Sequence, residues 1–212
     1  MSTSSPKPGL ADLASVPLSP AHAAELMMWE AHVRGSPVWR RRKLTEVRDL
    51  MALSQIASRL RIEMLDATTD LRVVLRMRCA VPCLENEDAE LHIAEEAVLG
   101  LTYPEKALRE PQPGFAFVQI MKPRNVFMAV VSRDINQVLC LGTTLPVGLP
   151  VREIVLASYG ALTMQNVMID ERDPAGVMFA PAAIWWQQRP GLIPLSDVPF
   201  LSDEDVVEEA AS

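Results

Sequence analysis

Apolar residues recur with two different periods along the chain, and each period predicts a type of secondary structure. Between Trp39 and about Ser58 they recur every three or four residues, which is the pattern of an amphipathic helix. The apolar positions of this helix are Leu44, Val47, Leu50, Met51 and Ile56. An Ala-rich stretch over residues 21–33 predicts a further helix, which Gly35-Ser36-Pro37 would end. Two helices are therefore expected before the first strand.

After the helices the period shortens to two, which is typical of strands. Residues 60–64 alternate between apolar and polar, and a longer alternation covers residues 71–81. Residues 89–101 and 115–121 continue the series, separated by the Pro-rich connection of residues 103–114. The sequence therefore predicts an antiparallel meander of four strands with one long final loop.

The rest of the chain is irregular at first and then helical. Pro and Gly interrupt every apolar run over residues 123–151, which predicts an extended loop. Helical spacing returns over residues 154–162 and again near residues 177–188. The second helix contains Trp185-Trp186, and neighbours on a helix point about 100° apart, so one of the two rings is expected in the core.

These elements predict an α+β protein with a single main domain over residues 37–200. That length suits one domain, since domains commonly contain ~100–150 residues. The Ser- and Pro-rich residues 1–20 predict a flexible leader, and residues 21–36 an added N-terminal helix. The acidic residues 201–212 predict a disordered tail.

Composition narrows the class of function. The net charge of −7 argues against nucleic-acid binding, which needs a positive surface to displace counterions from phosphates. The longest apolar runs are shorter than the ~18–20 residues that cross a bilayer, and the first thirty residues contain no signal-like apolar stretch. Three cysteines are too few, and odd in number, for a disulfide framework. We therefore expect a cytoplasmic protein that binds neither nucleic acid nor a membrane.

The three cysteines differ in their expected surroundings. Cys79 falls on the apolar phase of its strand, where core packing is expected, and Cys83 follows just beyond it. Cys140 falls in the loop between the sheet and the following helices, where a thiol can be accessible and reactive. Cys140 is therefore the candidate nucleophile.

Metal and protease chemistry are less well supported by the sequence. Cys79, Cys83 and His92 could be imagined as zinc ligands, but no fourth ligand is evident, and side chains along a strand alternate between faces. We expect no metal and no cofactor. A cysteine protease needs a base beside Cys140, and the histidines His22, His32 and His92 all lie far upstream, outside any recognisable signature.

Several local sequences resemble the ubiquitin-conjugating enzyme family, over about residues 39–190. Tyr103-Pro104 is similar to the Tyr-Pro that ends the third strand in that family, and prolines follow in the loop before strand four. Residues 125–131 occupy the place of the family's aromatic-His-Pro-Asn segment. Val138-Leu139-Cys140-Leu141 resembles its apolar-Cys-Leu active-site motif. The shared order of these motifs is more specific than any one of them.

Two further matches follow the cysteine, and one motif departs from the family. Asp173-Pro174 and Ala182-Ala183 resemble the family's Asp-Pro turn and its Ala-rich helix start. Met128-Ala129-Val130 replaces His-Pro-Asn and removes the asparagine that supports isopeptide formation in the family. Asn136 or Gln137 could take over the support of an oxyanion or of the loop, because an amide side chain can donate hydrogen bonds to either.

The resemblance implies a fold, a reaction and partners. The fold would be the ubiquitin-conjugating one, in a divergent, prokaryotic-type version: an N-terminal helix, the four-stranded meander, an active-site loop and C-terminal helices. Cys140 would accept a ubiquitin-like protein from an activating enzyme as a thioester. Asp173 would orient or deprotonate the lysine of a target protein. Arg40, Arg41, Arg42 and Lys43, at the start of the main helix, would dock the activating enzyme.

Two alternatives stay open at the level of sequence. The loss of the family's asparagine is compatible with a non-catalytic relative that keeps the fold as a scaffold or binding module. A small cysteine hydrolase that acts on the same kind of conjugate would share the Cys140 nucleophile but would need a nearby base, for which His92 is the best candidate.

Overall fold

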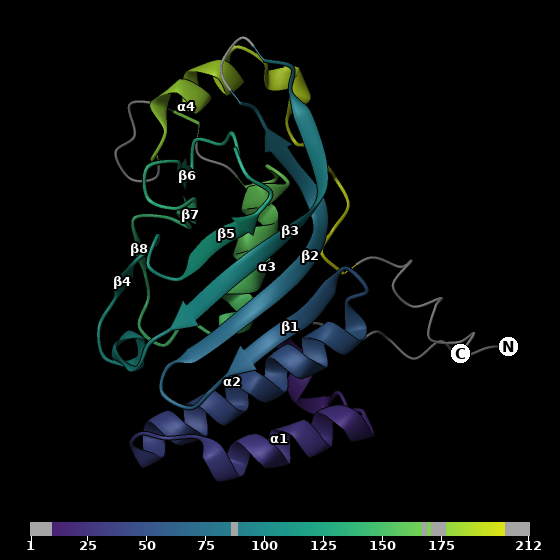
Figure 1. Cartoon of the computed structure of the whole chain (residues 1–212), viewed down its shortest axis with the longest axis vertical. Helices are drawn as coiled ribbons and strands as arrows, with labels where there is room; N and C mark the ends of the chain where they lie inside the picture. The colour runs from purple at the N-terminus through teal and green to yellow at the C-terminus, as the bar shows by residue number, and fades with distance from the viewer. Residues whose placement is uncertain (1–9, 86–88, 167–168, 171–176, 202–212) are drawn as a thin grey trace, which may run out of the picture.

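A six-stranded antiparallel sheet forms the centre of the molecule (Figure 1). The computed structural model describes residues 10–85, 89–166, 169–170 and 177–201, and the structural statements below concern these residues. The first four strands in the sheet are β1 (Leu60–Asp66), β2 (Leu71–Cys83), β3 (His92–Tyr103) and β5 (Val118–Lys122). They lie side by side in chain order, each antiparallel to the next. The meander predicted from the two-residue alternation is confirmed.

The predicted loop over residues 123–151 is wrong in part, because it contains three short strands. The strands are β6 (Val131–Ser132), β7 (Val138–Leu139) and β8 (Thr144–Leu145). β7 pairs with β5 and with β6, so these two strands extend the sheet to the order β1-β2-β3-β5-β7-β6. β8 pairs with β4 (Gln112–Pro113) in a separate two-stranded ribbon. Strands of two residues are too short to show an alternation in sequence.

Four α-helices and three 3₁₀ segments complete the fold. The α-helices are α1 (Pro20–His32), α2 (Pro37–Ile56), α3 (Val151–Leu162) and α4 (Ala180–Gln187), and the 3₁₀ segments are η1 (Leu10–Ser15), η2 (Glu105–Leu108) and η3 (Pro190–Leu192). The hydroxyls of Ser19 and Ser36 cap α1 and α2 by accepting backbone N–H groups, and a proline follows each cap. All four helices lie close to their predicted positions.

α2 and α3 pack against the sheet, α1 packs on α2, and α4 lies at the other end of the molecule (Figure 1). α3 lies behind the strands, α2 lies below β1, and α1 lies outside α2 (Figure 1). The apolar side of α3 includes Ile154, Val155 and Leu162, all 0–1% exposed. In contrast, α1 buries no residue completely, so it is an outer addition to the core rather than a part of it.

Part of the predicted flexible leader is folded, which corrects the expectation for residues 10–19. Leu13 is fully buried in the core and Val16 is 7% exposed. The guanidinium of Arg48, on α2, donates hydrogen bonds to the carbonyls of Leu13, Ala14 and Val16. These contacts are long-range in sequence, so local composition did not indicate them. Residues 1–9 and 202–212 lie outside the described residues.

Two predictions about single side chains are confirmed. Cys79 is buried in β2, with 6% of its surface exposed. Of the two adjacent tryptophans, Trp186 is fully buried and donates a hydrogen bond from Nε1 to the Phe127 carbonyl at 2.8 Å, whereas Trp185 is half-buried. Within the described parts of the chain, no helix is both long enough and apolar enough to span a bilayer.

Candidate functional site

Cys140 lies one residue beyond β7, at the end of the sheet. Its backbone N–H donates to the Val130 carbonyl at 2.8 Å, and its Sγ is hydrogen-bonded to the Gly142 carbonyl oxygen at 3.3 Å. Only 7% of the residue is exposed. The expectation of an accessible thiol in the loop between sheet and helices is therefore wrong, because Cys140 continues the hydrogen bonding of β7 instead of leaving the sheet.

The β4–β8 ribbon lies against the residues that follow Cys140. Here we use the name β4–β8 ribbon for residues 112–116 together with residues 142–145. The N–H of Leu141 donates to the Gly114 carbonyl at 3.2 Å. A Cβ placed on Gly114 would lie 1.9 Å from the Gly142 carbonyl oxygen, so only glycine permits this approach. Gly142 has a φ of +125°, a conformation that glycine adopts readily.

The segment matched to His-Pro-Asn is part of the core. Residues 126–130 are all buried, and Met128 and Ala129 are fully enclosed. The Ala129 carbonyl accepts hydrogen bonds from the backbone N–H groups of Met178 at 2.7 Å and Phe179 at 3.0 Å. This segment therefore anchors the chain that leads to α4, and it presents no polar side chain to Cys140.

Support of the loop comes from Gln137 rather than from Asn136. The Asn136 side chain is exposed, and it makes no hydrogen bond to any residue in the described ranges. The buried Gln137 amide accepts from the Val126 N–H at 3.0 Å and donates to the carbonyls of Ile120 at 3.2 Å and Pro123 at 2.9 Å. Both residues have positive φ angles, of 47° and 57°. The amide of Gln137 therefore holds the end of β5 to the segment matched to His-Pro-Asn.

Arg133 is a second support for this segment, and the sequence reasoning missed it. Its guanidinium donates to the carbonyls of Leu84, Asn125 and Val126, and so joins the end of β2 to residues 125–126. It also lies over the rings of Phe127 and Phe179, at 5.3 and 5.2 Å from their centroids. Burial lowers the pKa of Arg133 from its usual value. A single arginine near a Pro- and Gly-rich stretch carries no pattern that would have indicated this role.

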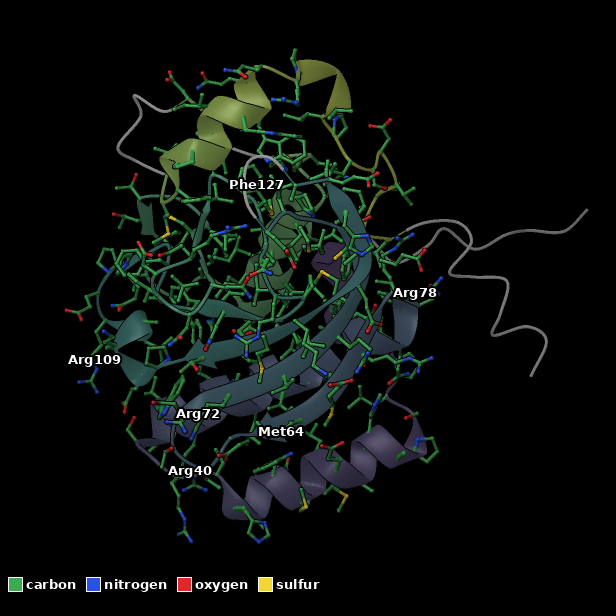
Figure 2. The ribbon with its side chains drawn as sticks, turned by 45° about the horizontal axis from the view of Figure 1, so that its top comes forward. Arg40, Met64, Arg72, Arg78, Arg109 and Phe127 are labelled. Atoms are coloured by element: carbon green, nitrogen blue, oxygen red, sulfur yellow. The ribbon has the colours of Figure 1, made fainter. Side chains whose placement is uncertain are left out.

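The basic cluster at the start of α2 divides into buried and exposed members. Lys43 is fully buried, and its ammonium donates to the carbonyls of Arg34, Ala67, Thr68 and Thr69 at 2.6 to 3.1 Å. Lys43 therefore cannot belong to a docking surface, which corrects that assignment. Arg40 and Arg41 are exposed, and their guanidiniums make no hydrogen bond or ion pair within the described residues. Figure 2 shows Arg40 at the edge of the molecule, where α2 begins.

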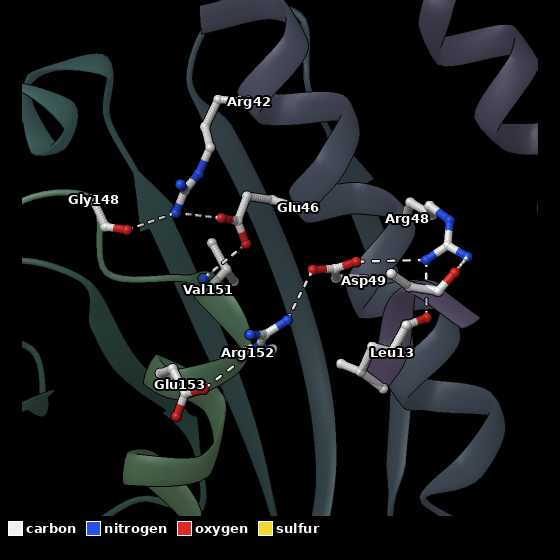
Figure 3. Close-up of polar contacts among 10 residues, drawn as sticks. Leu13, Arg42, Glu46, Arg48, Asp49, Gly148, Val151, Arg152 and Glu153 are labelled. Carbon is white, nitrogen blue, oxygen red and sulfur yellow. Dashed lines mark hydrogen bonds and ion pairs between the residues drawn. The ribbon is translucent and has the colours of Figure 1, made fainter. Parts of the chain in front are cut away.

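Arg42, the fourth member, connects α2 to the chain beyond Cys140 (Figure 3). It forms an ion pair with Glu46 at 2.6 Å and donates to the Gly148 carbonyl at 2.8 Å. The other oxygen of Glu46 accepts the Val151 N–H at 2.8 Å, so a side chain of α2 caps the first turn of α3. Burial raises the pKa of Glu46, and the charge of Arg42 opposes that shift.

A second ion pair reinforces the same junction. Asp49, on α2, contacts Arg152, on α3, at 3.3 Å, and Arg48 approaches the other oxygen of Asp49 at 3.6 Å (Figure 3). The two connections position the start of α3 on α2. They therefore also position the end of the loop that begins at Cys140.

The remaining candidates do not come together at Cys140. Asp173 lies outside the described residues. His92 is the first residue of β3. Cys140 follows Leu139, which pairs with Val118 of β5, and Val118 in turn pairs with Leu101, near the other end of β3. Nine residues at ~3.3 Å each place His92 about 30 Å from that point. His22 and His32 lie on α1, where they hydrogen-bond to Gln55 and to the Met28 carbonyl.

The described ranges contain no group of three or more His, Cys, Asp or Glu side chains that could hold a metal ion. Cys83 and His92 are paired across β2 and β3, and Cys79 lies four residues before Cys83 in β2.

Comparison of the chain with known proteins finds no matching family model, no matching curated protein and no matching solved structure.

Proposed function

We propose that this protein is a ubiquitin-conjugating-type transferase, of a divergent prokaryotic kind, that carries a ubiquitin-like protein as a thioester on Cys140. The observation that carries the proposal is the place of Cys140 in the order of elements. Cys140 follows a helix and a four-stranded antiparallel meander, and α3 begins at Val151, after a short connection. This is the order that the family resemblance implies, and it adds to the local motifs around Tyr103 and Cys140.

The chemistry of the other two cysteines supports the choice of Cys140. Both lie within β2, away from the connection between sheet and helix. Burial raises the pKa of Cys79 to about 12 and also raises that of Cys83. Because the thiolate is the nucleophile, a thiol with a raised pKa reacts slowly at neutral pH.

The proposed reaction has two acyl transfers. The Cys140 thiolate attacks the carbonyl carbon of the thioester on an activating enzyme; a new C–S bond forms, the old one breaks, and the departing sulfur takes up a proton. A lysine amine of a target protein then attacks the same carbon, which forms the amide and releases Cys140 as thiolate. The proton lost by the amine passes to a base. We assign that role to Asp173, from the sequence resemblance alone.

A loading assay tests the proposal. The protein, a matching activating enzyme, its ubiquitin-like protein and ATP should give an adduct that a thiol reductant removes. Cys140→Ala should abolish the adduct, and Cys140→Ser should give an ester that resists the reductant, because an oxygen replaces the sulfur. Cys83→Ala is the matched control and should load like the unchanged protein. An adduct that persists in Cys140→Ala would show that another residue carries the acyl group.

The docking part of the proposal rests on Arg40 and Arg41. Both line a groove of about 520 Å³ between α1 and α2, together with the apolar side chains of Leu26 and Leu44. Cations at the N-terminal end of a helix oppose its dipole, so an acidic partner would offset that cost. The exposed Arg40 and Arg41 therefore remain as the docking residues, because Lys43 is buried and Arg42 is bound to Glu46 and to the Gly148 carbonyl.

Reversing the charge of both arginines should slow loading. For the double variant Arg40→Glu/Arg41→Glu we expect the loading rate at limiting activating enzyme to fall about tenfold, because steering by complementary charge acts mainly on association. Stopped-assay rates at two salt concentrations measure this, and the difference from the unchanged protein should shrink at high salt. Arg109→Glu/Arg124→Glu, a reversal of two other exposed arginines, is the control. Equal slowing in both double variants would contradict a docking role for the start of α2.

A second candidate function, a non-catalytic scaffold with the same fold, is favoured by two observations. Cys140 is 7% exposed and hydrogen-bonded, and the residues in place of His-Pro-Asn are apolar and buried. A scaffold would bind the ubiquitin-like protein without forming the reducible adduct, so the loading assay separates the two functions. The hydrolase alternative loses support, because His92 lies about 30 Å along the sheet from the Cys140 end.

A further inference from the structure

We propose that the β4–β8 ribbon is a cover over Cys140, and that its two strands must separate before the thiol can react. The inference rests on the proposed function, since it concerns how the thiol of that site is exposed. Cys140 is 7% exposed, although the proposed reaction brings a large thioester partner to its sulfur. A covered nucleophile in such an enzyme requires a segment that opens.

The contacts of the ribbon identify it as that segment. The Gly142 carbonyl, which belongs to the ribbon, is hydrogen-bonded to the Cys140 sulfur at 3.3 Å. The same carbonyl is the group that Gly114 approaches so closely that a Cβ would lie 1.9 Å from it. The backbones of residues 114 and 142 are thus packed against each other directly beside the thiol. Gly114 therefore packs against the carbonyl that engages the thiol hydrogen.

The ribbon is also the weakly held part of this region. Its two strands have two residues each, and they form a sheet separate from the main one. The hydrogen bond from the Gly114 N–H to the Thr143 carbonyl is long, at 3.4 Å. Pro113, Thr143 and Thr144 are exposed, and 47% of Phe115 is exposed. Segments with few buried contacts and exposed backbone hydrogen bonds open at a lower free energy than the core.

The first segment of the ribbon is anchored at both ends, which would let residues 113–116 swing away from residues 142–145 without unfolding the sheet. The anchors are Gln112, its first residue, which is 3% exposed, and Phe117, just after it, which is 4% exposed and whose ring centroid lies 5.8 Å from that of Tyr103. On the second strand, the hydrogen bond of Arg42 to the Gly148 carbonyl holds the chain just after the ribbon. An opening between these anchors exposes Cys140 and leaves β5 and β7 paired.

Alkylation rates of the individual cysteines test the cover. The native protein is treated with N-ethylmaleimide, and peptide mapping by mass spectrometry gives a rate for each thiol. In Gly114→Ala the added Cβ collides with the Gly142 carbonyl and forces the ribbon open, so the rate at Cys140 should rise about tenfold or more. The rates at Cys79 and Cys83 should not change. Gly191→Ala is the matched control, since a Cβ there meets no atom within 4 Å.

A reversible disulfide between the two strands of the ribbon tests the cover in the opposite direction, by holding it closed. Pro113 and Thr144 are paired across the ribbon, so the double variant Pro113→Cys/Thr144→Cys can form a disulfide of ordinary geometry. When it is oxidised, the rate at Cys140 should fall about tenfold below that of the same variant reduced. Peptide mapping confirms that the disulfide joins the two introduced cysteines. If Gly114→Ala fails to fold, this variant alone decides the question.

An equal Cys140 rate with the disulfide oxidised and reduced would overturn the proposal, because the thiol would then react without separation of the ribbon's two strands. Alkylation needs no activating enzyme and no ubiquitin-like protein. A protein whose Cys140 rate follows the ribbon but that never loads would therefore refute the proposed function and keep the cover. A protein that loads, but whose Cys140 alkylation rate does not depend on the ribbon, would support the proposed function and refute the cover.

Discussion

Lys43→Met is expected to lower the free energy of unfolding by about 2–4 kcal/mol, although it replaces a charged side chain with an apolar one of similar length. The ammonium of Lys43 is the common donor for four backbone carbonyls from two separate turns. In the variant, the Thr68 carbonyl still accepts the backbone N–H of Arg34, and the Thr69 carbonyl still accepts the indole N–H of Trp39. The carbonyls of Arg34 and Ala67 lose their donor, which is costly at the fully buried Ala67.

Burial lowers the pKa of Lys43, while Asp70 and Asp66 oppose that shift. The residue therefore holds its charge against a desolvation cost, and its four carbonyl partners offset that cost. The measurement is urea unfolding followed by circular dichroism. Arg41→Met is the matched control, because it removes a cation from the same cluster at an exposed position and should change stability by about 0.5 kcal/mol or less. Equal losses in the two variants would show that Lys43 acts as a surface charge.

Gln137→Ala is expected to lower the free energy of unfolding by about 2–3 kcal/mol. The buried Val126 N–H loses its acceptor, and the carbonyls of Ile120 and Pro123 lose a donor. A buried polar group without a partner costs more than the hydrogen bond itself contributed. The lost contacts lie in β5 and in the segment between β5 and β6, so the effect should be largest there.

Hydrogen exchange locates that effect. The Val126 amide should exchange faster in Gln137→Ala by a larger factor than amides in the centre of β2. Asn136→Gly is the control at the neighbouring position: its side chain is exposed and its φ is 47°, so glycine should be neutral or slightly stabilising there. A Val126 amide that exchanges at the unchanged rate in Gln137→Ala would contradict the role of this amide as a support.

The candidate site was only partly predictable from the sequence. The position of Cys140 between sheet and helix followed from the order of the elements, because each long element has its own period. Its burial did not follow, since the cover comes from the β4–β8 ribbon, whose first strand precedes Cys140 by about thirty residues. Gln137 and Asn136 are adjacent and chemically alike, and only the tertiary structure places one inside and the other outside.

The basic cluster shows the same limit. Four consecutive cations, Arg40 to Lys43, look equivalent in sequence, but successive residues of a helix point about 100° apart. Lys43 therefore faces the turns beside α2, Arg42 faces the start of α3, and Arg40 and Arg41 face solvent. The position of a residue in a helix sets the direction of its side chain, but the neighbouring elements determine whether that side chain is buried or exposed.

The sequence alone determined the long elements of this protein: two helices, a meander of four antiparallel strands and two later helices. Their apolar periods repeat over enough residues to be unambiguous. Only the tertiary structure decided which short segments became strands, that the residues around Leu13 join the core, and that Cys140 is covered. These outcomes depend on contacts between residues far apart in the chain, and a local pattern carries no information about such partners.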